Sequence, residues 1–343
     1  MSNESVQVSV ASSGGGITEF RFIDRAVNPL NWEMGRESAS NDEPCLRGHF
    51  LCLDRWGAPS AAEVENGMTF HGEAAYAPWR LVNREGFAGS HLEAEMVCEL
   101  PIAQMTVRRL MRLENNQAVL VVRERITNTG KLGRIYNVVQ HPSIAPPFLD
   151  PDTIVDSNAQ YGFVQGSRVP ESVAAADLWP NATIQGELVD LSRFQNDESG
   201  TPYSDVSTFI FDASSEYGWV TASSPNTGLL LGYLWRVEAY PWLAIWRARS
   251  NGRVAARGLE FGTTGLHQPY AELVRVGRIL GRSLYEYIDA NETLEKSYIA
   301  FLLKIPHDFQ GVAEINNNDG ILELIERRDP NPRVFSLEVG TQF

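Results

Sequence analysis

The sequence contains few cysteines and no long hydrophobic segment. Its 343 residues include three cysteines, Cys45, Cys52 and Cys98. A small and odd number of cysteines does not make a disulfide framework, and no CxxC pair suggests a zinc site. No stretch approaches the roughly 18 apolar residues of a membrane-spanning helix. The N-terminus lacks the basic region and apolar run of a signal peptide. We therefore expect a soluble cytoplasmic protein with buried thiols.

An excess of basic residues is also missing. Lys and Arg number 29 against 43 Asp and Glu, which gives a formal net charge of −14 at pH 7. Proteins that bind nucleic acid need a basic face, and so do proteins that adhere to anionic membranes. We therefore expect neither nucleic acid nor a membrane as a partner.

Helical periodicity is nearly absent, and residues 269–279 are the main exception. Elsewhere apolar and polar residues alternate, or short apolar runs lie between turn signals, as in strands. The Asn318-Asp319-Gly320 step between two such runs is a strong tight-turn signal. The β segments lie within residues 6–12, 18–26, 105–130, 207–237, 242–264, 284–305 and 312–326.

So many strands in a chain of this length predict a sandwich or a barrel. Stacked extended sheets accommodate them better than one small barrel. No linker, repeat or low-complexity block divides the chain, so we expect a single domain over residues 1–343. The predicted fold is all-β, a large antiparallel β-sandwich.

Three residues are candidates for chemistry. His71 is followed by Gly72, which would let the backbone approach a ligand closely. Glu260 is flanked by Leu259 and Phe261, so it lies on the opposite strand face from two apolar side chains and becomes a candidate base if that face lines a cavity. His141 is the third candidate. The simpler interpretations are hydrogen-bonded structural histidines and a glutamate that faces water.

His141 lies in the segment VVQHPSIAPPFLD, which begins as a strand and then turns rich in proline. We predict that the strand ends at His141 and presents it at a cavity rim. Pro142, Pro146 and Pro147 would then fix the backbone that follows.

Four motifs, in order, resemble the aldose 1-epimerase (galactose mutarotase-like) superfamily. They are GGGITEF, then FHGEA followed by Trp79, then YNVVQHPSIAPPFL, and finally YPWLAIW leading into GLEFGTTGLHQP. They run from about residue 14 to about residue 270. The resemblance implies a supersandwich fold and the interconversion of the α and β anomers of a sugar by acid and base catalysis, with no metal or redox cofactor.

The resemblance also implies roles for individual residues. Glu260 matches the general base, His141 the general acid, and His71 a second histidine that holds and polarises the sugar. The residues implied to bind substrate are Arg47, Asp205, Trp242, Asn137 and Trp79.

The sequence departs from the best-known mutarotases after His141, where PSIAPPFLD replaces a Tyr-Phe-Asn-Leu type run. This indicates a divergent member and leaves the sugar open. A phosphosugar would require basic residues such as Arg47 with Arg80 or Arg84. Other interpretations are a non-catalytic carbohydrate-binding protein, and a lyase or glycosidase that pairs Glu260 with Asp205. We expect a monomer or a homodimer.

Overall fold

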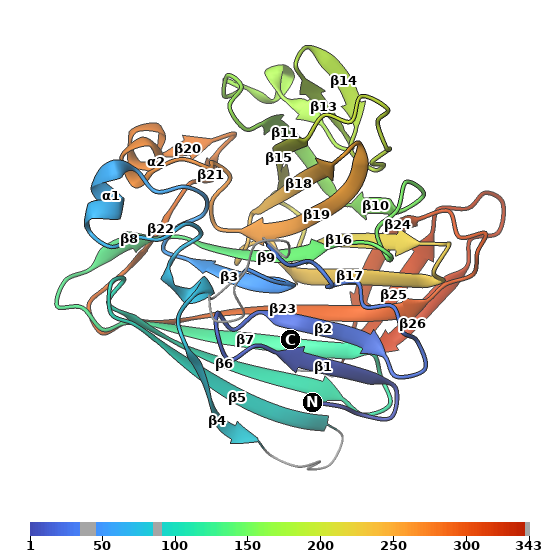
Figure 1. Cartoon of the computed structure of the whole chain (residues 1–343), viewed down its shortest axis with the longest axis horizontal. Coiled ribbons are helices and arrows are strands. Elements are labelled where there is room, and N and C mark those ends of the chain that lie inside the picture. Colours follow the sequence, from blue (N-terminus) through green and yellow to red (C-terminus); the bar gives the residue numbers. More distant parts are fainter. Residues whose placement is uncertain (35–45, 85–90, 340–343) are drawn as a thin grey trace.

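The computed structural model describes residues 1–34, 46–84 and 91–339. Two large antiparallel sheets dominate it (Figure 1). The first has nine strands, in the spatial order β1 (Val6–Val10), β2 (Ile17–Phe22), β3 (His49–Leu53), β9 (Val138–Ile144), β19 (Arg253–Gly262), β18 (Trp242–Ser250), β15 (Tyr203–Phe211), β11 (Ala159–Val164) and β12 (Asp177–Leu178). The second has eight, in the order β10 (Ile154–Ser157), β16 (Tyr217–Ser224), β17 (Leu229–Arg236), β23 (Thr293–Lys304), β7 (Val119–Asn128), β6 (Met105–Glu114), β5 (His91–Leu100) and β4 (Trp79–Arg84). The predicted antiparallel β-sandwich is confirmed.

Smaller elements surround the two sheets. The short sheets are β13 (Asn181–Ile184) with β14 (Glu187–Asp190), β20 (Arg278–Ile279) with β21 (Arg282–Ser283), β8 (Arg134–Tyr136) with β22 (Glu286–Ile288), and β24 (Val312–Asn318) with β25 (Ile321–Glu326) and β26 (Val334–Glu338). The helices of the described residues are α1 (Ala61–Glu65), α2 (Tyr270–Val276) and the 3-10 turns η1 (Glu73–Ala75) and η2 (Val173–Ala175). Helix α2 confirms the helix predicted within 269–279. None of these helices is long and apolar enough to cross a membrane.

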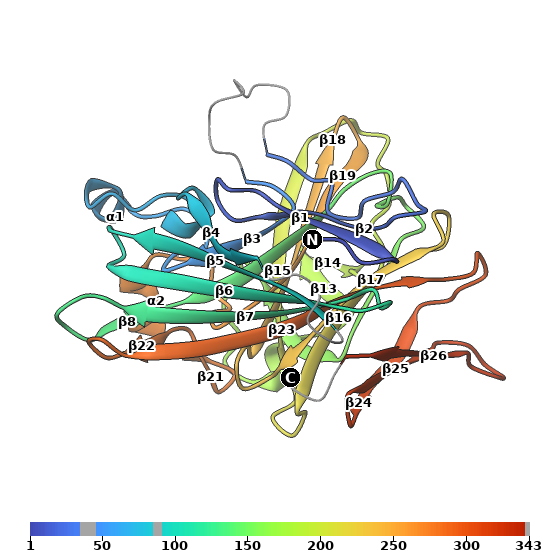
Figure 2. The same cartoon turned by 90° about the horizontal axis from the view of Figure 1, so that it is seen from below.

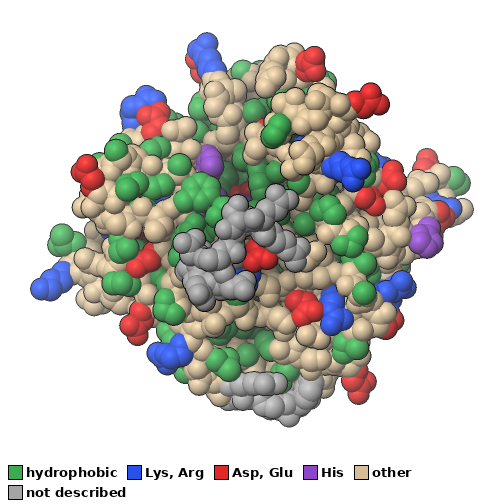
Figure 3. All heavy atoms as spheres, in the orientation of Figure 1, with side chains coloured by type: hydrophobic (Ala, Val, Ile, Leu, Met, Phe, Trp, Pro, Cys, Tyr) green, Lys and Arg blue, Asp and Glu red, His purple; other side chains and the backbone are tan. Residues whose placement is uncertain are grey.

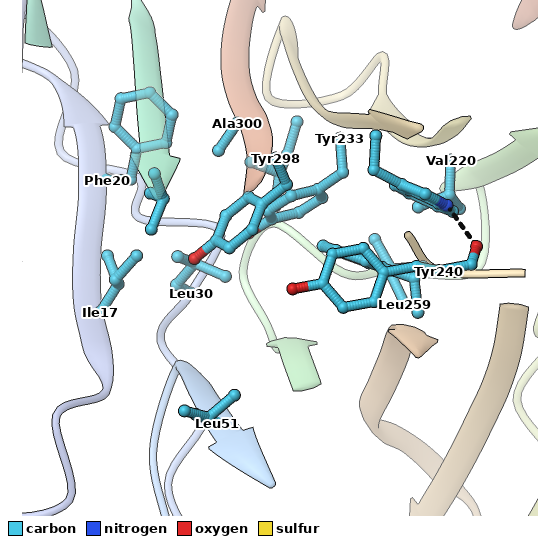
Figure 4. Close-up of a cluster of buried hydrophobic side chains, with 14 of the residues drawn as sticks. Ile17, Phe20, Leu30, Leu51, Val220, Tyr233, Tyr240, Leu259, Tyr298 and Ala300 are labelled. Carbon is cyan, nitrogen blue, oxygen red and sulfur yellow. Dashed lines mark hydrogen bonds between the residues drawn. The ribbon is translucent and has the colours of Figure 1, made fainter. Parts of the chain in front are cut away.

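The main hydrophobic core lies between the two large sheets. Leu51 and Leu259 from the nine-stranded sheet are buried in one cluster with Tyr233 and Ala300 from the eight-stranded sheet (Figure 4). Full burial of a leucine side chain such as Leu51 or Leu259 stabilises the fold by about 1.5–3 kcal/mol. Because successive side chains of a strand face opposite ways, one set of side chains points into this core and the other set points away from it.

A second hydrophobic cluster covers the other face of the eight-stranded sheet. Ile299 and Phe301 of β23 pack there with Leu322 and Leu324 of β25. Figure 2 shows β24–β26 at one end of the molecule. This arrangement leaves the outer face of the nine-stranded sheet as the place where a site can form.

A buried polar bridge crosses the main core. Arg109 of β6 pairs with Glu124 of β7, with 2.7 Å between Nε and Oε1. Gln140 of β9, on the opposite sheet, donates its side-chain amide to Glu124 Oε2 at 2.6 Å. Because neighbouring strand residues face opposite ways, His141 points to the outer face while Gln140 anchors β9 from within.

The prediction that a strand ends at His141 is wrong. Strand β9 continues to Ile144, and His141 is paired with Phe50 of β3 in the middle of the strand. Strand β19 flanks β9 on its other side, where Gln140 pairs with Phe261. Pairing with two neighbours holds the backbone at His141, and Pro142 lies within the strand rather than after it.

Candidate active site

The outer face of the nine-stranded sheet carries a cavity of about 260 Å³. Hydrophobic side chains border a hollow in this part of the molecule, over β3, β18 and β19 (Figure 3). The residues that line the cavity are Trp32, Met34, Leu46, Phe50, Trp56, Phe70, His71, His141, Ser204, Val206, Trp246, Glu260 and His267. All three residues singled out as catalytic candidates, Glu260, His141 and His71, thus lie in one cavity.

Glu260 reaches the cavity because of strand alternation. Leu259 and Phe261 are fully buried in the main core, and Glu260 between them faces the other way. Gly258, two residues earlier on the same face, leaves room for the carboxylate: a Cβ there would lie 2.7 Å from Glu260 Oε1. The predicted separation of Glu260 from its apolar neighbours is confirmed.

His141 and Glu260 are in direct contact on the cavity floor. The distance from His141 Nε2 to Glu260 Oε1 is 3.2 Å, and both side chains are buried. Burial disfavours the charged form of each group. It therefore raises the pKa of Glu260 to about 8 and lowers the pKa of His141 to about 3. Both shifts favour the uncharged forms, a protonated Glu260 beside a neutral His141 imidazole.

Second contacts fix both members of the pair. Nδ1 of His141 lies 3.0 Å from the Ser143 hydroxyl, so an N–H at Nδ1 donates to Ser143 Oγ while Nε2 accepts from Glu260. The Trp56 indole N–H donates to Glu260 Oε2 at 2.6 Å. This bond stabilises the carboxylate and opposes part of the rise in the pKa of Glu260. It engages Oε2, so Oε1 is the oxygen that faces His141.

His71 belongs to a turn between α1 and η1, and its backbone is left-handed, with φ of 63°. The backbone N–H of Gly57 donates to its Nδ1 at 3.3 Å, and the buried Cys52 thiol lies 3.2 Å from the same nitrogen. Burial, followed by the nearby His141, lowers the pKa of His71 well below its usual range. His71 is therefore neutral, with its proton on Nε2.

Gly72 serves a different purpose from the predicted close approach to a ligand. A Cβ at this position would collide with the carbonyl oxygen of Leu53 in β3. The glycine lets the turn that carries His71 pack against the sheet.

Aromatic rings surround the catalytic candidates. The Phe50 ring stacks on the His141 imidazole, with centroids 4.3 Å apart and planes at 20°. Trp32 meets Trp246 edge to face at 5.3 Å, and Trp56 lies 4.6 Å from the His267 ring. The cavity therefore has rigid aromatic walls.

Sequence reasoning missed Trp32, Phe50, Trp56, Trp246 and His267 as lining residues. Trp246 lies opposite Gly258 in the β18–β19 ladder, and Phe50 lies opposite His141 in the β3–β9 ladder. These neighbours follow only from the register between strands, which the sequence of a single strand does not reveal.

Two tryptophans predicted to bind substrate are buried away from this cavity. The Trp79 indole donates to Ala74 O at 2.9 Å and lies under the Arg109 guanidinium. The Trp242 indole donates to Ser283 O at 2.8 Å in a separate hydrophobic cluster. Neither side chain lines the cavity.

The three polar residues predicted to bind substrate do not line it either. Asp205 forms an ion pair with Arg247, with 2.7 Å between Oδ2 and Nη2, on the face of β15 opposite Ser204 and Val206. Arg47 lies 3.9 Å from Glu33, and Asn137 is fully buried. Asp205 does not reach the cavity because successive side chains of a strand point to opposite faces of the sheet.

A larger depression of about 550 Å³ lies elsewhere on the surface. Its charged lining residues are Glu216, Arg236, Glu238, Arg278, Arg282 and Glu286. Arg236 and Glu216 neutralise each other at 2.8 Å. We place the chemistry in the smaller cavity because it gathers buried acid and base groups.

The described part of the chain holds no group of three or more His, Cys, Asp or Glu side chains arranged to bind a metal ion. The predicted buried thiols are confirmed for Cys52 and Cys98, which are free and buried. Cys45 lies outside the described residues.

The fold is that of galactose mutarotase-like proteins. A candidate aldose 1-epimerase from Klebsiella pneumoniae has a TM-score of 0.64 at 12% identity, over 88% of this chain and 78% of its own. A galactose mutarotase-like protein from Clostridium acetobutylicum has a TM-score of 0.63 at 14% identity, over 89% and 94%. A galactose mutarotase related enzyme from Lactobacillus acidophilus has 0.60 at 12%, over 89% and 97%. No protein-family model and no curated protein sequence matches this chain.

Proposed function

We propose that the protein interconverts the α and β anomers of an aldose by general acid and base catalysis. The reaction removes a proton from the C1 hydroxyl, delivers one to the ring oxygen, and closes the ring again after rotation about the C1–C2 bond. The observation that supports this proposal best is the contact of 3.2 Å between His141 Nε2 and Glu260 Oε1 on a buried cavity floor. The shared fold agrees with it.

The proton content of the pair suits this chemistry. Ring opening needs one group that accepts a proton and one that donates a proton, hence one proton in total. Glu260 and His141 together hold one proton between pH values of about 3 and 8. Transfer from Glu260 to His141 along the contact creates the carboxylate that takes the C1 proton and the imidazolium that protonates the ring oxygen. Closure on the other face reverses these steps.

His71 complements the pair as a neutral donor. Its Nδ1 accepts a hydrogen bond from Gly57 N–H, so Nε2–H remains to hold a sugar oxygen. Such a donor stabilises the oxygen on which negative charge develops without adding a proton to the exchange.

The geometry lends less support to the alternatives. A glycosidase needs two carboxylates across the scissile bond, about 5–10 Å apart. Asp205 is paired with Arg247 outside the cavity, and Glu260 is the single carboxylate among the described lining residues. Arg47, which a phosphosugar would use, does not line the cavity and lies near Glu33.

Proton NMR of the anomeric signals tests the proposal. A panel of aldoses is followed with and without protein, and exchange between anomers is measured at equilibrium. We expect acceleration that falls at least about 100-fold in Glu260→Gln and in His141→Asn. The surface variants Glu295→Gln and His307→Asn are matched controls, and their rates should stay unchanged.

Two outcomes would contradict the proposal. Full activity in both cavity variants would remove Glu260 and His141 from the chemistry. Chemical-shift changes on binding without acceleration of any sugar would instead indicate a non-catalytic carbohydrate-binding protein.

A further inference from the structure

Most of the polar side-chain groups in the cavity are already paired within the protein. Glu260 meets His141 through Oε1 and Trp56 through Oε2. Both nitrogens of His141 are engaged, one with Glu260 and one with a serine hydroxyl. The Trp246 indole N–H donates to Ser204 Oγ at 3.0 Å. A ligand is therefore recognised by the few groups that keep unused hydrogen-bonding capacity.

Among the lining residues that the structure describes, His267 keeps the most of this capacity. Its backbone N–H is bonded, but neither nitrogen of its ring has a hydrogen-bond partner in the described part of the chain. Neither nitrogen is a buried atom. By contrast, Gly57 N–H donates to Nδ1 of His71 and fixes the tautomer of that ring. The tautomer of His267 is thus open to selection by a ligand.

The protein nevertheless holds the His267 ring in a defined position. The backbone N–H of His267 donates to Gln165 Oε1 at 2.9 Å, and Gln165 Nε2 donates to Gly265 O at 2.8 Å. The ring centroid lies 4.6 Å from that of Trp56, and a Cβ at Gly57 would come within 2.0 Å of its Nε2. Gly57 therefore leaves the space that the imidazole occupies. A ring that is held in place but not hydrogen-bonded is preorganised for a ligand.

The charge state of His267 limits the kind of group that it can bind. Burial, followed by the nearby Arg55, lowers the pKa of His267 to about 4, so the ring is uncharged at neutral pH. A neutral imidazole offers one N–H donor and one acceptor nitrogen. A hydroxyl also donates and accepts, whereas a carboxylate only accepts and pairs best with a cation. The ring therefore suits a hydroxyl.

We propose that His267 binds a hydroxyl of the sugar and selects substrates that carry it. This inference rests on the proposed function, in which Glu260, His141 and His71 act on the C1 hydroxyl and the ring oxygen. Because these three side chains serve the reacting atoms, recognition of another hydroxyl falls to a different residue. A sugar that lacks this hydroxyl leaves the imidazole without a partner in the complex, which lowers kcat/KM.

A double-mutant cycle between the side chain and the sugar hydroxyls tests the inference. The parent is whichever aldose is accelerated most, with D-glucose, D-galactose and D-mannose tested first. Its derivatives lack single hydroxyls at C2, C3, C4 or C6. We measure kcat/KM for anomer exchange by NMR with the wild type and with His267→Leu, which removes both ring nitrogens. Loss of one of these hydroxyls should lower kcat/KM at least about tenfold in the wild type, but less than about twofold in His267→Leu.

Further variants separate recognition from structure. His267→Gln keeps a donor and an acceptor near the end of the side chain, so its preference for the hydroxyl should lie between those of the wild type and His267→Leu. His267→Ala removes the nitrogens in the same way if the leucine variant does not fold, as judged by urea unfolding. The matched control is His307→Leu, because His307 is exposed and lies outside the cavity. It should retain the wild-type preference.

The outcomes distinguish this inference from the proposed function. If every hydroxyl mattered as much in His267→Leu as in the wild type, His267 would recognise none of them, and the epimerase proposal would stand. If no aldose were accelerated, the epimerase proposal would be wrong. The same cycle would then be measured through dissociation constants from the NMR shifts of the sugars. A hydroxyl whose loss weakens binding only when His267 is present would support its role, and the absence of such a hydroxyl, or of binding, would overturn it.

Discussion

At the scale of residues, burial rather than a neighbouring charge tunes the candidate site. Glu260 and His141 are shifted in opposite directions by the same physical cause, loss of water around the charged form. Both shifts favour the uncharged forms, and the proposed mechanism uses the one proton that these forms hold between them. Hydrogen bonds from outside the pair, to Trp56 and Ser143, set which atoms take part.

Trp56 should act as a positioning residue for Glu260. Trp56→Phe removes the N–H that stabilises the carboxylate while keeping an aromatic ring. A hydrogen bond to a charged group contributes roughly 1.5–3 kcal/mol, which corresponds to about 1–2 pKa units. We therefore expect the alkaline limb of the pH–rate profile to move upward by about that amount, with a lower kcat.

The matched control is Trp219→Phe, which changes a buried tryptophan in the cluster beneath β24–β26. It should leave the pH profile in place. An alkaline limb that stays fixed in Trp56→Phe would show that the indole only fills space.

At the scale of elements, β9 and β19 are adjacent antiparallel strands, and they bring the proposed acid and the proposed base together. Sequence patterns were sufficient to place Glu260 on the strand face that lines the cavity, because Leu259 and Phe261 define the face it avoids. They also identified His71 and His141 as candidates. The register between strands decides which side chains meet across a sheet, so Trp246 and Phe50 were not predictable, and neither was the course of β9 beyond His141.

Gly258 should matter to activity more than to stability. In Gly258→Ala the new methyl group would lie 2.7 Å from Glu260 Oε1 and 3.0 Å from Trp246 Cβ. The flexible carboxylate can move aside at little cost to folding, but it then loses its contact with His141. We expect kcat to fall by about 10- to 100-fold, as for a small displacement of a catalytic group.

Urea unfolding of the same variant provides the comparison. We expect the free energy of unfolding to fall by at most about 1–3 kcal/mol, the typical cost of overpacking. If the variant were much less stable but kept the wild-type kcat, Gly258 would matter to stability rather than to activity.

At the scale of the whole molecule, two sheets enclose one apolar core crossed by a buried ion pair. The antiparallel sandwich could be predicted, because alternation and turn signals recur along most of the chain. The bridge from Arg109 through Glu124 to Gln140 could not, since its members come from three strands and two sheets. Charge in a sequence does not show that the side chain is buried.

Replacing one member of the bridge should lower the free energy of unfolding considerably. Arg109→Met leaves Glu124 buried with an uncompensated charge, and the free energy of unfolding should fall by about 3–5 kcal/mol. The double variant Arg109→Met/Glu124→Leu should recover most of that loss. Arg125→Met breaks the exposed pair between Arg125 of β7 and Glu295 of β23, and it should cost less than about 1 kcal/mol.

Urea titrations of the four proteins measure these differences. If Arg109→Met were as mild as Arg125→Met, the buried bridge would not stabilise the packing of the two sheets. A double variant no more stable than Arg109→Met would show that the loss comes from packing rather than from the stranded charge.

The central claim is that Glu260 and His141 share one proton and use it to open and close a sugar ring. The most direct measurement is the pH dependence of kcat/KM for anomer exchange by NMR, from about pH 4 to pH 9.5, after subtraction of the protein-free rate. Because the pair keeps its proton between about 3 and 8, the rate should be level through the acid range. Above about pH 8 Glu260 loses that proton, and the rate should fall toward tenfold per pH unit. A rate that falls on acidification near the ordinary histidine pKa of about 6.5, or that continues to rise through pH 9, would contradict the shared proton.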